Sequence, residues 1–259
     1  MKNVIVLLLM SMGISSFAQL SGEISYTTTV NLHKMFGDDE RGKRMKEFMP
    51  ETSEFKNQLL FTSDETVYKN VAEDDEEEVT VGNEGPGQGR AARMMHYMKK
   101  RMAPPNDIIY CDVKNGLIVS KKEFMDKTFL IRDTLNQATW KITGEMKEVS
   151  GMNCMKAEFI PTENDTDKIV VWFTPEIPIS SGPAGYGGLP GLIVHLDKND
   201  GHVVISISNI VMREIEKKEI EEPKKGKEVT EEEYHAIVRK KMEEQRKNWG
   251  GRDGGGHRH

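Results

Sequence analysis

The feature that most limits the fold is a succession of strand-like runs in the second half of the chain. These runs are rich in β-branched and aromatic residues, and short turns containing Gly, Asn, Asp or Ser join them. Six or more consecutive strands with no helix between them indicate an antiparallel sheet. We therefore predict a mainly β chain, a single antiparallel curved sheet or half-barrel with peripheral helices. The runs are Ile108–Val113, Leu117–Lys121, Thr128–Asp133, two runs around Ser150-Gly151, Lys168–Thr174, Gly191–Leu196 and His202–Ile215.

The first half adds a strand at Gly22–Leu32, a short helix that ends at Pro50, and a hairpin around Ser63-Asp64-Glu65. Residues 73–90 are acidic and then glycine-rich, with too few apolar residues to offset the entropy of ordering them, so we expect a mobile insertion. A methionine-rich stripe at helical spacing follows, formed by Ala91, Met94, Met95, Met98 and Met102.

The two ends of the sequence carry different signals. Residues 1–18 have the layout of a secretory signal peptide with cleavage after Ala18, which predicts an exported protein of the periplasm or the exterior. No apolar run is long enough to span a membrane as a helix. We expect a β domain over residues 19–213 and a helical extension over residues 214–249, in which Thr230 and Glu233 form a capping box. Residues 250–259 should be disordered.

Charge and cysteine content narrow the class of protein further. The net charge of −6 argues against a nucleic-acid-binding protein, which normally presents a basic face. Cys111 and Cys154 would meet an oxidising compartment, where a disulfide and two free buried thiols are about equally compatible with the sequence. Neither cysteine has a second cysteine or a histidine two to four residues away, so no metal site is expected there.

The stretch SSGPAGYGGLPGLIVHLD, Ser180 to Asp197, is dense in glycine and proline and then continues as an apolar strand. Glycine permits close backbone approach and proline fixes φ, so the pattern predicts a stiff, compact crossover. Leu189, Leu192 and Ile193 would plug the sheet. We favour this structural plug over a ligand-binding loop. The glycines do not form a phosphate cradle, because a strand and not a helix follows them.

The same stretch resembles the GLPGLI family of secreted proteins, which is named after the hexapeptide Gly188 to Ile193. The resemblance extends to Trp172, to Ile177-Pro178 and upstream to GMNCMKAEF. It implies an exported protein of Bacteroidetes-type bacteria, from a family without an established activity. The family is also similar to a bowl-shaped β module attached to a secreted glycoamidase, which implies an accessory or binding unit. The motif residues are Gly182, Pro183, Gly187, Gly188, Leu189, Pro190, Gly191, Leu192 and Ile193.

The favoured function is that of a cell-envelope binding or accessory module for a peptide, a glycan or a membrane-protein partner, without a cofactor. Its ligand would lie in an apolar concavity lined by residues such as Trp140, Trp172 and Tyr186, and His195 is a further candidate binding residue. One alternative is a hydrolase with Ser180 or Ser181 beside His195, although no G-x-S-x-G elbow occurs. His195 with Asp197 could also ligate a metal or share a proton.

A second alternative is a copper-binding protein. The sequence MMHYMKKRM sets methionine thioethers and His96 on one helix, a ligand combination that suits Cu(I). Lys99, Lys100 and Arg101 crowd cations beside these groups and count against it.

Overall fold

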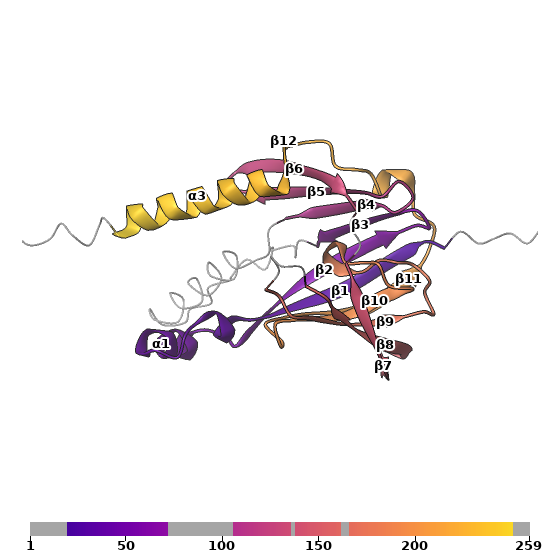
Figure 1. The fold of residues 1–259 in the computed structure, drawn as a ribbon, viewed down its shortest axis with the longest axis horizontal. Coiled ribbons are helices and arrows are strands. Elements are labelled where there is room, and N and C mark those ends of the chain that lie inside the picture. The colour runs from indigo at the N-terminus through magenta and orange to yellow at the C-terminus, as the bar shows by residue number, and fades with distance from the viewer. Residues whose placement is uncertain (1–19, 72–105, 136–137, 162–165, 251–259) are drawn as a thin grey trace, which may run out of the picture.

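A computed structural model describes residues 20–71, 106–135, 138–161 and 166–250 (Figure 1). Twelve strands form one sheet, and all neighbouring strands are antiparallel except the pair β12 and β6. The chain is thus mainly β, as the runs of alternating residues predict. The strands are β1 (Gly22–Asn31), β2 (Thr52–Phe61), β3 (Glu65–Asn70), β4 (Ile108–Asp112), β5 (Leu117–Phe124), β6 (Lys127–Thr134), β7 (Trp140–Val149), β8 (Met152–Phe159), β9 (Ile169–Thr174), β10 (Leu192–Lys198), β11 (Val203–Met212) and β12 (Lys227–Val229).

The strand order, β12-β6-β5-β4-β3-β2-β1-β11-β10-β9-β8-β7, divides the sheet into two sequential meanders. Strands β1 to β6 make one meander and β7 to β11 make the other. The two meet where β1 pairs with β11 along most of its length, from Gly22 opposite Met212 to Val30 opposite Val203. This seam places the first strand of the chain at the centre of the sheet.

The short link between β6 and β7 explains why the sheet is curved. Thr134 and Trp140 are six residues apart in sequence, so they lie at most about 22 Å apart. Ten strand-to-strand steps separate β6 from β7, which is about 48 Å across a flat sheet. The sheet therefore has to curl, and Figure 1 shows its two ends bending toward each other.

The curl gives the sheet an inner and an outer face. The inner face carries the main core, with Tyr26, Leu59, Val171 and Phe173 among its buried side chains. On the outer face, Leu60 of β2 belongs to a second cluster that covers β2 to β6, formed by Leu60, Val67, Tyr110, Val119, Leu130, Ile215 and Ile220. The segment after β11 supplies Ile215 and Ile220, so it acts as a strap over that half of the outer face.

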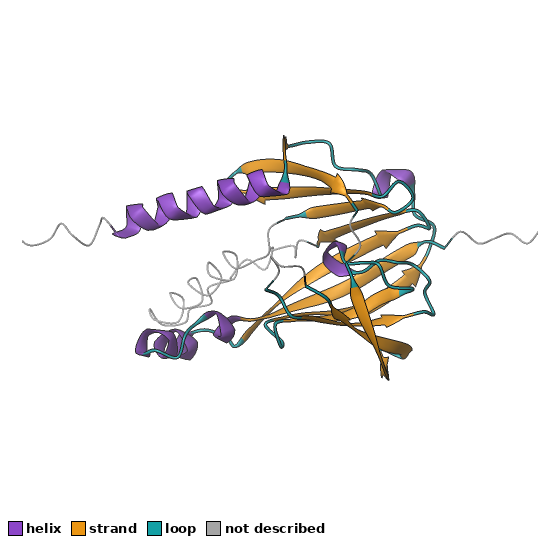
Figure 2. Cartoon of the chain, viewed as in Figure 1, coloured by secondary structure: helices purple, strands orange, loops and turns teal. Residues whose placement is uncertain are grey.

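The α-helices α1 (Glu40–Phe48) and α3 (Glu231–Gly250) lie at the periphery of the sheet (Figure 2). Three short 3₁₀ turns are also present: η1 (Leu32–Met35), η2 (Pro183–Gly185) between β9 and β10, and η3 (Lys217–Glu219). The predicted capping box is confirmed: Thr230 N donates to Glu233 Oε2 at 3.0 Å, and Glu233 N donates to Thr230 Oγ1 at 3.1 Å. Tyr234 and Ile237 of α3 pack on Phe129 and Ile131 of β6. In the described part of the chain, no helix is long and apolar enough to cross a membrane.

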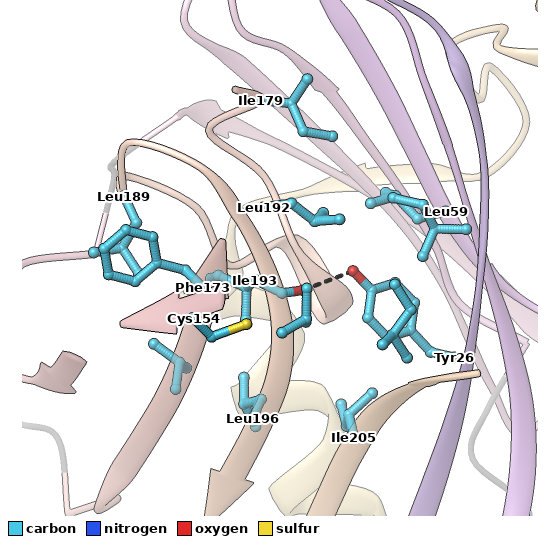
Figure 3. Close-up of a cluster of buried hydrophobic side chains, with 14 of the residues drawn as sticks. Tyr26, Leu59, Cys154, Phe173, Ile179, Leu189, Leu192, Ile193, Leu196 and Ile205 are labelled. Atoms are coloured by element: carbon cyan, nitrogen blue, oxygen red, sulfur yellow. Dashed lines mark hydrogen bonds between the residues drawn. The ribbon is translucent and has the colours of Figure 1, made fainter. Parts of the chain in front are cut away.

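A bulge in β10 is completed by a tyrosine from the centre of the sheet. The register with β9 shifts between Ile193 and His195, so the carbonyl of Ile193 leaves the regular ladder. The fully buried Tyr26 hydroxyl donates to that carbonyl oxygen at 2.8 Å (Figure 3). Burial also holds the pKa of Tyr26 well above its ordinary value of 10.0, so the hydroxyl stays protonated and remains a donor.

Replacing Tyr26 by phenylalanine should lower the free energy of unfolding by about 1–3 kcal/mol, because the Ile193 carbonyl is left buried without its donor. Urea denaturation of the two proteins measures the difference. A Tyr234→Phe variant is the control for a half-buried tyrosine on α3, outside the main core. Equal losses in the two variants would contradict a special role for the bulge contact.

Candidate functional site

The glycine- and proline-rich crossover between β9 and β10 lies against the inner face of the sheet. Leu189, Leu192 and Ile193 are almost fully buried in the main core (Figure 3). At its turn η2 the crossover reaches across to the other meander, where Gly185 lies against Ile109 of β4 and Ile118 of β5. The crossover thus fills the space between the two ends of the curled sheet, which is the arrangement expected of a plug.

Three motif glycines stand where a side chain has no room. A Cβ on Gly191 would lie 2.2 Å from Thr174 O, and one on Gly187 would lie 2.7 Å from Ser180 O. A Cβ on Gly182 would lie 2.6 Å from the Cβ of Ile193. These close approaches account for the glycines of the motif by packing alone.

The structure divides the four candidate binding residues into two pairs on opposite faces of the sheet, Trp140 with Tyr186 and Trp172 with His195. Trp140 and Tyr186 pack edge to face on the inner side, with ring centroids 6.3 Å apart. The indole Nε1 of Trp140 donates to Gly187 O at 2.8 Å. These two rings hold the crossover in place, whereas Trp172, the third residue of the expected concavity, does not share their face of the sheet.

Trp172 and His195 lie on the outer face. Trp172 stands between Val171 and Phe173, both fully buried on the inner side, so strand alternation points Trp172 outward. The register then sets outward residues of six neighbouring strands side by side, with His195 opposite both Trp172 and Ser206. We call this set the outer row. It consists of Lys156, Trp172, His195, Ser206, Thr27 and Lys56.

The side chains of the outer row are half-buried or exposed, and several contact one another. The ammonium of Lys147 on β7 lies 4.0 Å from the centroid of the Trp172 ring, a cation–π contact. His195 Nδ1 and Ser206 Oγ are 2.8 Å apart and share a hydrogen bond. Lys156 forms ion pairs with Glu145 at 2.9 Å and Glu158 at 3.4 Å. The row is therefore a polar surface with one aromatic ring.

Three influences set the protonation of His195. Burial, and then the ammonium of Lys147, lower the pKa of His195 below its ordinary value of 6.5, while the carboxylate of Asp197 acts in the opposite direction. His195 is therefore neutral at neutral pH, when its ring can both accept and donate a hydrogen bond.

The lowered pKa predicts a pH dependence of stability. As the pH falls below about 6.5, the unfolded chain binds a proton at His195 before the folded protein does. The wild type should therefore lose stability relative to a His195→Gln variant from pH 6.5 downward, until the folded pKa is reached, and the two should run parallel above pH 6.5. Unfolding by urea at a series of pH values measures this, and parallel curves throughout would contradict it.

The serines proposed for a hydrolase do not meet His195. Ser180 Oγ accepts from Gly188 N at 3.0 Å, and Ser181 is buried in the crossover on the inner face. Both line a cavity of about 20 Å³, with room for about one water molecule, and His195 is not among its lining residues. Catalysis by these serines with His195 is thus contradicted by the placement of the residues.

The two cysteines are free and buried, and no disulfide joins them. Cys111 lies on β4 and Cys154 on β8, with six strands between them in the sheet. Burial raises the pKa of both thiols, so neither is an activated nucleophile. The sequence is compatible with a disulfide or with two free thiols, and the structure contains two free thiols.

Metal binding finds no support in the described part of the chain, where no group of three or more His, Cys, Asp or Glu side chains could hold an ion. Asp197 shares the outer face with His195, but its carboxylate accepts from Gly201 N. The methionine-rich stripe with His96 lies outside the described residues, as do the acidic insertion at 73–90 and the segment interpreted as a signal peptide.

A larger hollow of about 440 Å³ lies at one end of β1 and β11 and is lined in part by Ser21, Thr62 and Arg213. The guanidinium of Arg213 is already held by ion pairs with Glu23 at 3.0 Å and Glu219 at 2.7 Å. These bonds fasten the strap after β11 to the first strand. These ion pairs account for Arg213, which together with Glu214 supplies the charged lining of the hollow.

Comparison with known proteins identifies a short match to a family and a match in fold. Residues 161–195 match a family model described as a protein of unknown function (Porph_ging). The matched segment contains β9, the crossover and the first part of β10, and so includes the hexapeptide of the GLPGLI resemblance. None of the curated proteins matches the chain.

Among solved structures, PNGF-II in two crystal forms resembles this chain. Each has a TM-score of 0.53 and 16% sequence identity, and the match covers 85% of this chain. It covers 33% of the PNGF-II chain, so the protein spans about a third of the length of that relative. At this identity the likeness establishes the class of fold, a mainly antiparallel β sheet, and nothing about activity.

Proposed function

We propose that the protein is an exported binding or accessory module of the cell envelope, and that it holds its ligand or partner on the outer row. The observation that carries this proposal is the outer row itself: a partly exposed line of polar side chains with Trp172 among them, crossing the centre of the sheet. A half-buried aromatic ring flanked by hydrogen-bonding side chains is a common composition for binding surfaces.

Binding suits this surface better than catalysis. His195 and Ser206 do form a hydrogen-bonded pair, which is the first requirement of a serine nucleophile. They lie, however, on β10 and β11, which have a paired strand on both sides. Ser206 is paired with Thr27 on one side and His195 on the other, so the backbone N–H groups around it are used in the ladder and do not provide an oxyanion hole above the sheet. A serine without that stabilisation is a poor catalyst.

The proposal is tested by capture from native cell envelopes. Purified protein, a Trp172→Ala/His195→Ala variant and a Met212→Ala control are each crosslinked to isolated envelopes and recovered. Met212 is 53% exposed, lies at the far end of β11 and lines the 440 Å³ hollow. We expect the double variant to lose the recovered component and the control to retain it. Loss in the control alone would assign the binding surface to the hollow, and equal recovery from all three proteins would overturn the proposal.

A further inference from the structure

We propose that the ligand of the outer row is a neutral glycan chain that lies across the strands and stacks on Trp172. This inference rests on the proposed function and names the chemical class of ligand for the same surface. Three properties of the surface support it: the direction of the row, its balance of charge, and the weak cation–π contact between Lys147 and the ring of Trp172.

The direction of the row determines how a ligand can be recognised. Its six residues occupy six adjacent strands, so the row runs perpendicular to the strands over a length of about 24 Å, with one side chain about every 4.8 Å. All six strands are paired on both sides. An extended peptide that adds to a sheet needs a free strand edge. A ligand on this surface instead contacts the side chains of the row. Because these side chains repeat at regular intervals, they suit a ligand whose own binding groups repeat along its length.

The charges around the row argue against a strongly charged ligand. The adjacent row on the same face contains Lys141, Glu158, Asp197 and Glu54, and Glu145 pairs with Lys156. With Lys56, Lys147 and Lys156, the surface carries four ammonium groups and four carboxylates. A polyanion requires a net basic surface, and a polycation a net acidic one.

The hydrogen-bonding groups match hydroxyl groups on a ligand. The hydroxyls of Ser206 and Thr27 and the neutral ring of His195 each donate and accept, as sugar hydroxyls do. The adjacent row adds only two half-buried valines, Val170 and Val204, which are fewer apolar contacts than the apolar face of a helix requires. A polymer of uncharged, polyhydroxylated rings satisfies both the charge and the hydrogen-bonding pattern.

Lys147 provides a sharp test, because its ammonium covers the ring on which a sugar would stack. Among the described residues no ion pair involves Lys147, so the cation–π contact is the interaction that holds it there. A contact of this kind at an exposed site is weak, and removing it should strengthen stacking of a neutral ligand by about two- to fivefold. An anionic ligand would instead lose an attractive charge and bind more weakly.

The experiment is a printed array of neutral and anionic glycans, followed by titration with the best soluble neutral oligosaccharide. We expect neutral glycans to bind, Trp172→Ala to weaken binding at least tenfold, Trp172→Phe to retain part of it, and Lys147→Ala to strengthen it about two- to fivefold. Raising the salt concentration should leave the affinity unchanged. Urea denaturation of each variant separates loss of binding from loss of folding.

Three results would overturn the inference: no glycan binding above that of Trp172→Ala, weaker binding by Lys147→Ala, or binding confined to anionic glycans. The envelope capture experiment keeps this failure distinct from failure of the proposed function. If a component is still recovered from envelopes and depends on Trp172 while no neutral glycan binds, the ligand class is wrong and the binding surface stands. If neither experiment depends on Trp172, both proposals fail.

Discussion

Replacing Gly191 by alanine should lower the free energy of unfolding by about 3 kcal/mol, because the added methyl group has no space. Its Cβ would lie 2.2 Å from Thr174 O and 2.7 Å from Thr174 C, and both atoms belong to the backbone at the end of β9. Backbone at the end of a central strand cannot move aside as the tip of a flexible side chain can. The strand and the crossover would have to separate, with loss of the packing of Leu192 and Ile193.

The matched control is Gly37→Ala. A Cβ on Gly37 meets its nearest neighbour, Asp39 Oδ1, at 3.7 Å, which is an ordinary contact, and the residue is exposed. We expect the free energy of unfolding of this variant to lie within about 0.5 kcal/mol of the wild-type value. Chemical denaturation measures both. A Gly191→Ala protein as stable as Gly37→Ala would show that the close approach at the crossover does not hold in solution.

Replacing Leu189 by alanine should lower the free energy of unfolding by about 3 kcal/mol, as expected for truncation of a fully packed leucine. Leu189 is 2% exposed although it belongs to a loop rich in glycine and proline. A loop that waits for a ligand would present such a side chain to solvent, and its truncation would change stability little. A large loss of stability would therefore indicate that the crossover is a structural plug, and a small loss would indicate a ligand-binding loop.

The comparison for Leu189 is Met146→Ala on the edge strand β7. Met146 is 68% exposed, so its truncation should change the free energy of unfolding by no more than about 0.5 kcal/mol. Thermal and urea unfolding of the two variants give the contrast. Similar losses in both would count against the plug, and envelope capture with Leu189→Ala would then test whether the crossover binds the partner.

Features encoded by neighbouring residues could be predicted from the sequence. The turn at Ser150-Gly151 joins β7 to β8, and both residues have positive φ, 51° and 80°, as a tight two-residue hairpin requires. Thr230 and Glu233 start α3 for the same reason, since a capping box is complete within four residues. Such signals do not depend on which strands later become neighbours.

Features that depend on register could not be predicted in this way. Trp140 is the first residue of β7, and Trp172 lies within β9. The sequence of either strand alone does not determine whether its tryptophan lies on the inner or the outer face of the sheet. The bulge between Ile193 and His195 and its completion by Tyr26 require strands far apart in sequence. The parallel strand β12 is only three residues long, so its pattern is too short to recognise. The sequence therefore indicates which residue types could bind a ligand, but it does not indicate which of them share a face of the sheet.

The seam between β1 and β11 has a consequence for the order in which the protein folds. Within the two meanders the longest connection is the 37 residues between Asn70 and Ile108, whereas the seam joins segments about 190 residues apart, as the pair Glu23 and Arg213 illustrates. Contacts of such long range form slowly, because a large loop must close before any pairing is gained. The two meanders can therefore form early and independently, and their union is the late step. A chain that ends before β11 would leave the edges of β1 and β10 open to pairing with other molecules, so truncation there should favour aggregation.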